Sequence, residues 1–403
     1  MLSCRIQRLF LLVLLVVLVA SPSEYPAQAS EVIGASVDYQ YGEWIEFNGK
    51  TSADLVIKDA LISIRARGEA DTFVDQVNPT PDGDISYRYS VTDRPLRAFT
   101  TIDYWFTIIP QEGKDITSPI FNFKYDDNRF NWQQLSYDPF QVYWFDGDLA
   151  FAQGVLDVAS EGLNRAKSLL PLEVPPTLTI YVYANASQIP ETPGKDWVAG
   201  HAYPDLGLMV VSLPDGPERR LEMERQVPHE LMHILLYETT GQGYENLPAW
   251  LNEGLSTMAQ LYPTPEYQIL LENAIKNDSL LPIVSLCQNF PIYASSAYLS
   301  YAEATYFTRY IYRQYGSSGL ASLVSSFADG LDCERGVEIA LGVSLARLED
   351  QWLKEGLGVK SDPRVEDQDR LMPWFFLLFV VLAVPLSLAT VGVLAAPRKQ
   401  VGA

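Results

Sequence analysis

Histidine and cysteine are scarce in this chain, with three of each among 403 residues. Basic residues are also in short supply: 29 Lys and Arg stand against 50 Asp and Glu, so the formal net charge is −21 at pH 7. Nucleic acids and anionic membrane surfaces bind through basic patches, so this balance argues against both as partners. We interpret the excess of Asp and Glu as residues of solvent-exposed acidic surfaces.

Two of the three histidines nevertheless stand four residues apart, in the stretch HELMH at residues 229–233. An α-helix turns about 100° per residue, so this spacing places both imidazoles on one face, one turn apart. By chance such a motif should occur in roughly one or two chains per thousand of this composition. The pattern therefore predicts that His229 and His233 are metal ligands.

A second helix should follow closely. Gly241 and Gly243 end the first helix, and Pro248 suits the first turn of the next. Because the connection is short, the two helices should be antiparallel neighbours, with Glu253 early in the second. A His-His-Glu set leaves one coordination position open, as catalytic zinc sites do. Bound zinc activates water and polarises a carbonyl oxygen, and Glu230 is placed to move the proton.

The HELMH motif, followed by Glu253 within the stretch WLNEG, resembles the gluzincin metallopeptidases. It is most similar to the aminopeptidase N group and the bacterial peptidase MA-like proteins, over roughly residues 140–357. The resemblance implies an α+β (thermolysin-like) catalytic domain with one zinc ion per chain, held by His229, His233 and Glu253. It also implies that Glu230 is the general base.

The stretch AYLSYAEATYF at residues 297–307 carries a further likeness. In the aminopeptidase N group a tyrosine at the head of the corresponding helix hydrogen-bonds the oxyanion. By position this residue resembles Tyr301, with Tyr298 as the alternative, and a phenol is a suitable donor to developing negative charge. Ordinary aromatic packing is the competing interpretation, because tyrosines crowd this segment.

One element of the aminopeptidases is missing. Nothing here resembles their Gly-x-Met-Glu-Asn segment, which holds the free amino terminus of the substrate, so we expect an endopeptidase. The same region offers an apolar run at 208–211, which reads as a strand. In gluzincins the matching edge strand pairs with extended substrate. His201, just before this run, is either a cleft residue or a structural histidine and is not needed as a ligand.

Both ends of the chain predict export and anchoring. Arg5 and Arg8 precede an apolar run and a small-residue site ending at Ala29, the plan of a signal peptide over residues 1–29, with an uncleaved anchor as the alternative. Residues 373–396 carry no charge and are long enough to cross a membrane as a helix. Basic residues follow directly, so the catalytic part should be extracytoplasmic and residues 397–403 should form a cytoplasmic tail.

The cysteines fit an exported chain without deciding their own state. Cys4 falls within the signal, which leaves Cys287 and Cys333 as an even pair in an oxidising compartment. A disulfide and two buried free thiols both remain open. The positions of Cys287 and Cys333 in the sequence do not match the ligand spacing of a second metal site.

Two globular domains are expected between the ends. Residues 30–135 alternate apolar and polar positions in about seven short segments, which suggests an immunoglobulin-like β-sandwich. Residues 136–360 should form the metallopeptidase domain, which includes a long amphipathic helix at roughly 147–170 and precedes a linker at 361–372. The sandwich shows no titratable cluster, so spacing or binding is its expected role.

Two functions remain in play. The first is a membrane-anchored extracytoplasmic zinc metallopeptidase that acts on peptides or proteins. The alternative is a non-catalytic cell-surface binding protein in which a metal merely stabilises one domain. Glu230 and an open coordination position favour the enzyme, because a structural site needs neither.

Overall fold

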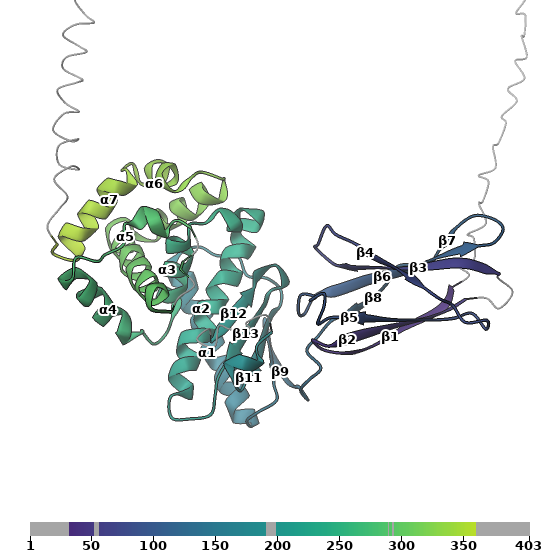
Figure 1. The fold of residues 1–403 in the computed structure, drawn as a ribbon. Coiled ribbons are helices and arrows are strands. Elements are labelled where there is room, and N and C mark those ends of the chain that lie inside the picture. The colour runs from purple at the N-terminus through teal and green to yellow at the C-terminus, as the bar shows by residue number, and fades with distance from the viewer. Residues whose placement is uncertain (1–31, 52–55, 191–198, 289, 292–293, 360–403) are drawn as a thin grey trace, which may run out of the picture. The chain divides into compact units, whose positions relative to one another are not determined.

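The computed structural model describes residues 32–51, 56–190, 199–288, 290–291 and 294–359, which divide into two compact units, Met1–Arg129 and Phe130–Ala403 (Figure 1). The expected signal peptide, linker, membrane helix and cytoplasmic tail lie outside the described residues: 1–29, 361–372, 373–396 and 397–403. No helix within the described ranges is long and apolar enough to span a membrane.

The first unit consists of antiparallel strands in two sheets (Figure 1). One sheet has the order β1-β2-β5, and the other has the order β4-β3-β6-β7 with β8 also paired to β6. The strands are β1 (Val32–Gln40), β2 (Trp44–Thr51), β3 (Ile57–Ala66), β4 (Phe73–Val77), β5 (Asp84–Ser90), β6 (Thr101–Pro110), β7 (Ile116–Thr117) and β8 (Phe121–Lys124).

The two sheets enclose a common apolar core. Strand side chains alternate between faces, so β6 buries Ile102, Tyr104, Phe106 and Ile108 at every second position. The ring of Phe47 on β2 lies 4.9 Å from that of Tyr104. Gly49 leaves space that the ring of Phe106 occupies. The unit is thus an all-β pair of layers, and its immunoglobulin-like class stays a prediction.

The second unit is built on a mixed sheet of order β12-β13-β11-β10-β9. Its central strands are parallel, and both outer strands are antiparallel to their neighbours. The strands are β9 (Gln133–Tyr137), β10 (Phe140–Trp144), β11 (Leu178–Tyr183), β12 (Gly200–Tyr203) and β13 (Leu208–Ser212). Because β9 already belongs to this sheet, the unit begins before residue 136.

The strand order corrects one expectation. The apolar run at 208–211 is a strand, β13, but it lies between β11 and β12 and is not an edge. Among the described residues the edge strand next to β13 is β12, which contains His201, and the opposite edge is β9. A single 3₁₀ turn at Pro204–Leu206 and Gly207, with φ of 60°, folds β12 back onto β13. The sequence GHAY lacks an apolar run, so the strand pattern did not include it.

Helices supply the rest of the second unit. The helix expected at 147–170 is α1 (Leu149–Leu169), and the Asp148 side chain caps it by accepting a hydrogen bond from the N–H of Phe151. The others are α2 (Arg219–Thr240), α3 (Ala249–Ala259), α4 (Pro265–Lys276), α5 (Ala294–Ala328), α6 (Cys333–Leu341) and α7 (Leu345–Gln351). Short turns complete the chain: η1 (Ala186–Gln188), η2 (Pro204–Leu206), η3 (Gly241–Asn246), η4 (Ile283–Leu286) and η5 (Trp352–Gly356).

Helix α2 runs through Pro228 without a break. Proline has no N–H, so the carbonyl of Glu224, four residues earlier, loses its partner within the helix. The N–H of Leu261, which follows α3, donates to this carbonyl at 2.9 Å. The pyrrolidine ring packs against Gly162 of α1, where any side chain would collide with it. The proline therefore fastens α2 to two neighbouring helices.

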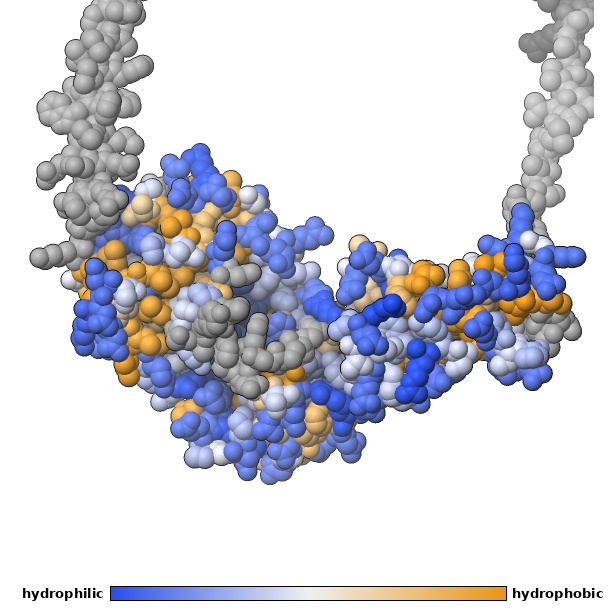
Figure 2. Space-filling view, viewed as in Figure 1, coloured by the Kyte–Doolittle hydropathy of each residue, from blue (hydrophilic) through white to orange (hydrophobic). Residues whose placement is uncertain are grey.

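The surface agrees with the composition. Figure 2 shows a face on which hydrophilic residues predominate and hydrophobic ones form smaller patches. Exposed large hydrophobic residues include Ile120 of the first unit and Ile269 on α4. Exposed apolar side chains are normal in folded proteins.

A disulfide joins Cys287, just after η4, to Cys333, the first residue of α6, across a sequence separation of 46 residues. The sequence left open whether these cysteines form a disulfide or remain two free thiols, and the structure contains the disulfide. The bond ties the segment before α5 to the helix after it. A cross-link of this span restricts the unfolded chain and so stabilises the folded one.

Replacing both cysteines by serine is expected to lower the free energy of unfolding by roughly 2–4 kcal/mol, because the unfolded chain regains its loop entropy. Urea unfolding of the full chain with and without reductant measures this difference. The parent protein should lose stability in reductant, whereas the double variant should not respond. Equal stability of the two proteins under oxidising conditions would contradict the assignment.

Candidate metal centre

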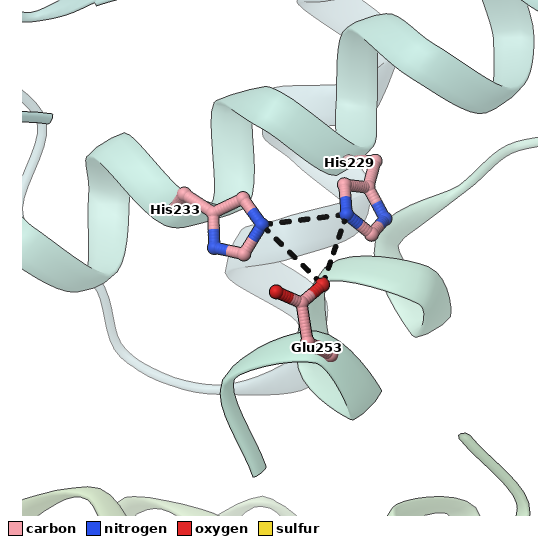
Figure 3. A group of neighbouring side chains, drawn as sticks. All are labelled: His229, His233 and Glu253. Carbon is pink, nitrogen blue, oxygen red and sulfur yellow. Dashed lines mark hydrogen bonds and ion pairs between the residues drawn. The ribbon is translucent and has the colours of Figure 1, made fainter. Parts of the chain in front are cut away.

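Helix α2 presents both histidines of the HELMH stretch to one point (Figure 3). Leu231 and Met232, which lie between them, are fully buried, and this fixes the rotation of the helix. The Nε2 atoms of His229 and His233 lie 3.3 Å apart. Both imidazoles are largely buried and face the same side of the helix.

Glu253 on α3 faces the two histidines (Figure 3). Its Oε2 atom lies 3.3 Å from Nε2 of His229 and 3.7 Å from Nε2 of His233. The next residue, Gly254, packs directly on Ala304 and Thr308 of α5, where a side chain would collide with both. This close approach holds α3 in position. The structure therefore brings together the three residues expected to hold a metal.

The donor set fits zinc. One ligand atom from each residue lies within 4.8 Å of the others, and these atoms are two imidazole nitrogens and a carboxylate oxygen. Glu253 Oε2 is buried and accepts no hydrogen bond from the described residues. A buried carboxylate oxygen that faces two imidazole nitrogens is suited to a divalent cation, and zinc prefers this ligand type.

A polar network contacts the Nδ1 side of the His233 imidazole, opposite the Nε2 atom that faces Glu253. Its Nδ1 atom lies 2.9 Å from Oδ1 of Asn252, 3.2 Å from the Tyr244 hydroxyl and 3.3 Å from Oγ of Ser256. The Asn252 amide also donates to Tyr244 at 3.0 Å. An amide oxygen can only accept, so Nδ1 carries the proton and Nε2 presents its lone pair to the metal position. The sequence analysis missed these partners, although Asn252 adjoins Glu253.

Glu230 lies beside the ligand cluster and lines the open cleft that leads to this cluster. It is buried, and its carboxylate accepts a hydrogen bond from the backbone N–H of Ala202 on β12. Gly200 leaves room for it, because a side chain there would meet its carboxylate. Burial, opposed by the charge of His229 and assisted by that of Glu253, raises the pKa of Glu230 to about 7.

The ligands perturb one another strongly. Burial lowers the pKa of His233 to about 4. Burial also acts to lower the pKa of His229, but the adjacent Glu253 carboxylate and the charge of Glu230 raise it overall. Burial raises the pKa of Glu253, and the two histidines more than reverse this effect. The cluster thus combines two buried carboxylates with two imidazoles.

Tyr301 on α5 borders the cluster. Its ring lies 6.4 Å from the ring of His229 and 5.1 Å from that of Phe290. Burial holds the pKa of Tyr301 well above its usual value, so the hydroxyl remains a donor. Tyr298 lines the same cleft but is 39% exposed. His201 on β12 packs edge-on against Tyr203, with ring centroids 4.8 Å apart.

An open cleft of about 720 Å³ leads to this cluster. Gly200, His229, Glu230, Tyr298 and Tyr301 line its inner part. The cleft therefore offers a substrate direct access to the proposed metal position, to Glu230 and to both candidate tyrosines. A structural metal site has no need of such access.

Residues 158–355 match the Peptidase MA superfamily. The matched segment contains the His-His-Glu cluster, Glu230 and Tyr301. It confirms the resemblance to the peptidase MA-like gluzincins and supports a zinc metallopeptidase in general. No curated protein matches the chain.

Solved structures give weaker likenesses to this chain. An aminopeptidase N family protein from Idiomarina loihiensis has 8% identity and a TM-score of 0.34, with 81% of this chain and 71% of that one covered. An M1 zinc metallopeptidase from Deinococcus radiodurans has 11% identity and a TM-score of 0.34, with 78% and 90% covered. A myokine structure has 16% identity and a TM-score of 0.21, with 24% and 97% covered.

We expect His233→Ala to abolish zinc binding, because it removes one of three ligands. Asn252→Ala should weaken zinc binding about 10- to 100-fold, since the imidazole of His233 loses the partner that orients it. Zinc content after dialysis against graded chelator measures both effects. Asn273→Ala, on an exposed position of α4, is the matched control. Zinc retention by Asn252→Ala equal to that of the control would refute the orienting role.

Proposed function

We propose that this protein is a membrane-anchored, extracytoplasmic zinc metallopeptidase that acts as an endopeptidase. The observation that carries the proposal is the position of Glu230. This carboxylate is not one of the clustered ligand groups, yet it is buried beside them and lines the same open cleft. A metal that only stabilised the fold would have no use for it.

The residues of the cleft divide the chemistry among them. His229, His233 and Glu253 would hold zinc, which when bound supplies Lewis-acid polarisation of a carbonyl and activation of water. Glu230 takes a proton from the attacking water and delivers it to the leaving amine. The Tyr301 hydroxyl donates to the oxygen on which negative charge develops. Asn252 and Tyr244 hold His233 in the required tautomer.

Endopeptidase activity is supported by the edge strand. Gly200, the first residue of β12, lies directly against the Glu230 carboxylate, so this edge passes the proposed general base. An extended peptide can add to such an edge through backbone hydrogen bonds, which require neither terminus of the substrate. The missing Gly-x-Met-Glu-Asn segment points the same way.

Anchoring and export rest on the sequence of the chain ends. The disulfide between Cys287 and Cys333 supports an oxidising compartment, because such bonds are rare in cytosolic proteins. The apolar residues 373–396 would hold the enzyme at the membrane, and the N-terminal β unit would act as a spacer or binding domain.

Glu230→Gln is expected to reduce turnover of an unfolded protein substrate by about 10²- to 10⁴-fold, because the general base is lost while its shape is retained. Tyr301→Phe should reduce turnover by about 10²- to 10³-fold with little change in KM. Zinc content should be unchanged in both variants. Peptide release assays and metal analysis provide the measurements.

Glu238→Gln, on an exposed position of α2, and Tyr312→Phe, further along α5, are the matched controls and should retain parental turnover. If the zinc-loaded parent cleaves nothing in a broad set of unfolded proteins and peptides, the enzyme proposal fails. The surface-binding alternative would then take its place.

Protease added to intact cells or spheroplasts should digest residues 30–370 and spare the tail at 397–403, because basic residues remain on the cytoplasmic side. Immunoblotting with tags at each end distinguishes the protected fragment. Recovery of the intact chain in the soluble cytoplasmic fraction would overturn the topology.

A further inference from the structure

A second cavity of about 290 Å³ adjoins the catalytic cleft. The two share Gln260, Thr264 and Tyr267 in their walls. The ring of Tyr267 stacks with that of Tyr301 at 6.4 Å, and Tyr301 in turn lies 6.4 Å from His229. The cavity is therefore a side pocket of the cleft. The rings of Tyr267 and Tyr301 lie between it and the metal ligand His229.

Two arginines from different helices line this side pocket, Arg165 of α1 and Arg309 of α5. The Nε of Arg165 donates to the backbone carbonyl of Met258 at 3.3 Å, and the guanidinium of Arg309 lies over the Tyr306 ring at 5.2 Å. Within the described part of the chain, no carboxylate lies within ion-pairing distance of either. Such a pair stands out in a chain with a net charge of −21.

The charges of the pocket act on one another. Burial lowers the pKa of Arg309, and the positive charges of Arg313 and Arg165 lower it further, against an opposing contribution from Tyr306. Arg165 and Arg309 are thus close enough to repel each other. An anion placed between them would relieve this repulsion and gain charge-assisted hydrogen bonds.

A neutral donor completes the lining. Thr257 of α3 is buried, and its hydroxyl has no hydrogen-bond partner among the described residues. A buried hydroxyl without a partner is costly unless a ligand or solvent satisfies it. Two guanidinium groups and a hydroxyl are the donors expected around a carboxylate.

We propose that this side pocket, lined by Arg165, Arg309 and Thr257, is a carboxylate-binding subsite for the peptide substrate. The inference rests on the proposed peptidase function and deepens it by naming a substrate feature. The carboxylate belongs either to an acidic side chain or to the free C-terminus, since both present the same planar oxygen pair. Because the side pocket opens from the cleft beside Tyr267, the acidic group would lie away from the scissile bond, at a position that the peptide series identifies.

The test measures peptide binding to the full chain carrying Glu230→Gln, in which turnover is suppressed. Octapeptides of alanine, leucine and serine carry one glutamate at each position in turn, each with a glutamine counterpart, and each is made as a C-terminal acid and as an amide. We expect one glutamate position, or the C-terminal acid, to bind about tenfold more tightly than its neutral counterpart. The first result assigns a side chain, and the second assigns the C-terminus.

Arg165→Gln alters an exposed side chain and should reduce this preference without affecting folding; adding Arg309→Gln should abolish it. Arg313→Gln is the matched control, because it removes an exposed arginine from α5 that does not line the pocket. It should leave most of the preference intact.

The subsite is wrong if acidic and neutral peptides bind equally, if none binds, or if the preference survives loss of both pocket arginines. An equal loss of preference in Arg313→Gln would also overturn it, because the effect would then be general electrostatics. Failure of the peptidase proposal is seen separately, as an absence of cleavage of these peptides by the zinc-loaded parent.

Discussion

The site depends on one constraint, that a carboxylate from one helix must meet two imidazoles from another within a few ångströms. Side chains of this length cannot bridge a loose helix pair, so α2 and α3 must be held at a fixed separation. Two close contacts do this: the backbone bond from Leu261 to Glu224, and the contact of Gly254 with α5. Because α5 carries Tyr301, the same packing also places the candidate oxyanion donor beside the ligands.

The cleft region of the second unit has an acidic part and a basic part, although the chain as a whole is acidic. Glu230 and Glu253 are buried together, which raises the pKa of Glu230, and a divalent cation would offset this concentration of negative charge. On the far side of the Tyr301 and Tyr267 rings, the charge is positive and comes from Arg165 and Arg309. A peptide lying along the cleft would therefore pass from an acidic, metal-binding end to a basic one.

The sequence was sufficient where the determinants are local. The two histidines follow helical periodicity, and the position of Glu253 follows from a short connection, so the cluster could be anticipated. The edge strand could not, because the order of strands in a sheet depends on contacts far apart in sequence, and the GHAY strand has no apolar run. The Arg165–Arg309 pair also joins distant segments, and the Tyr244 contact with His233 depends on the path of the turn η3 after α2. The uninterrupted path of α2 through Pro228 depends on the N–H of Leu261, which lies beyond α3 and is not visible in the local sequence.

The link between Leu261 and Glu224 involves only main-chain atoms. Substitution at either position leaves the donor and the acceptor in place, unless residue 261 becomes a proline, which has no N–H. The separation of the two ligand helices is therefore insensitive to most sequence drift at these two positions. Proline at position 228 leaves this carbonyl without a donor inside the helix, so the N–H of Leu261 meets no competitor there. The proline next to the first ligand thus makes one of the two contacts that set the geometry of the metal centre a property of the backbone, whereas the other still requires that residue 254 carry no side chain.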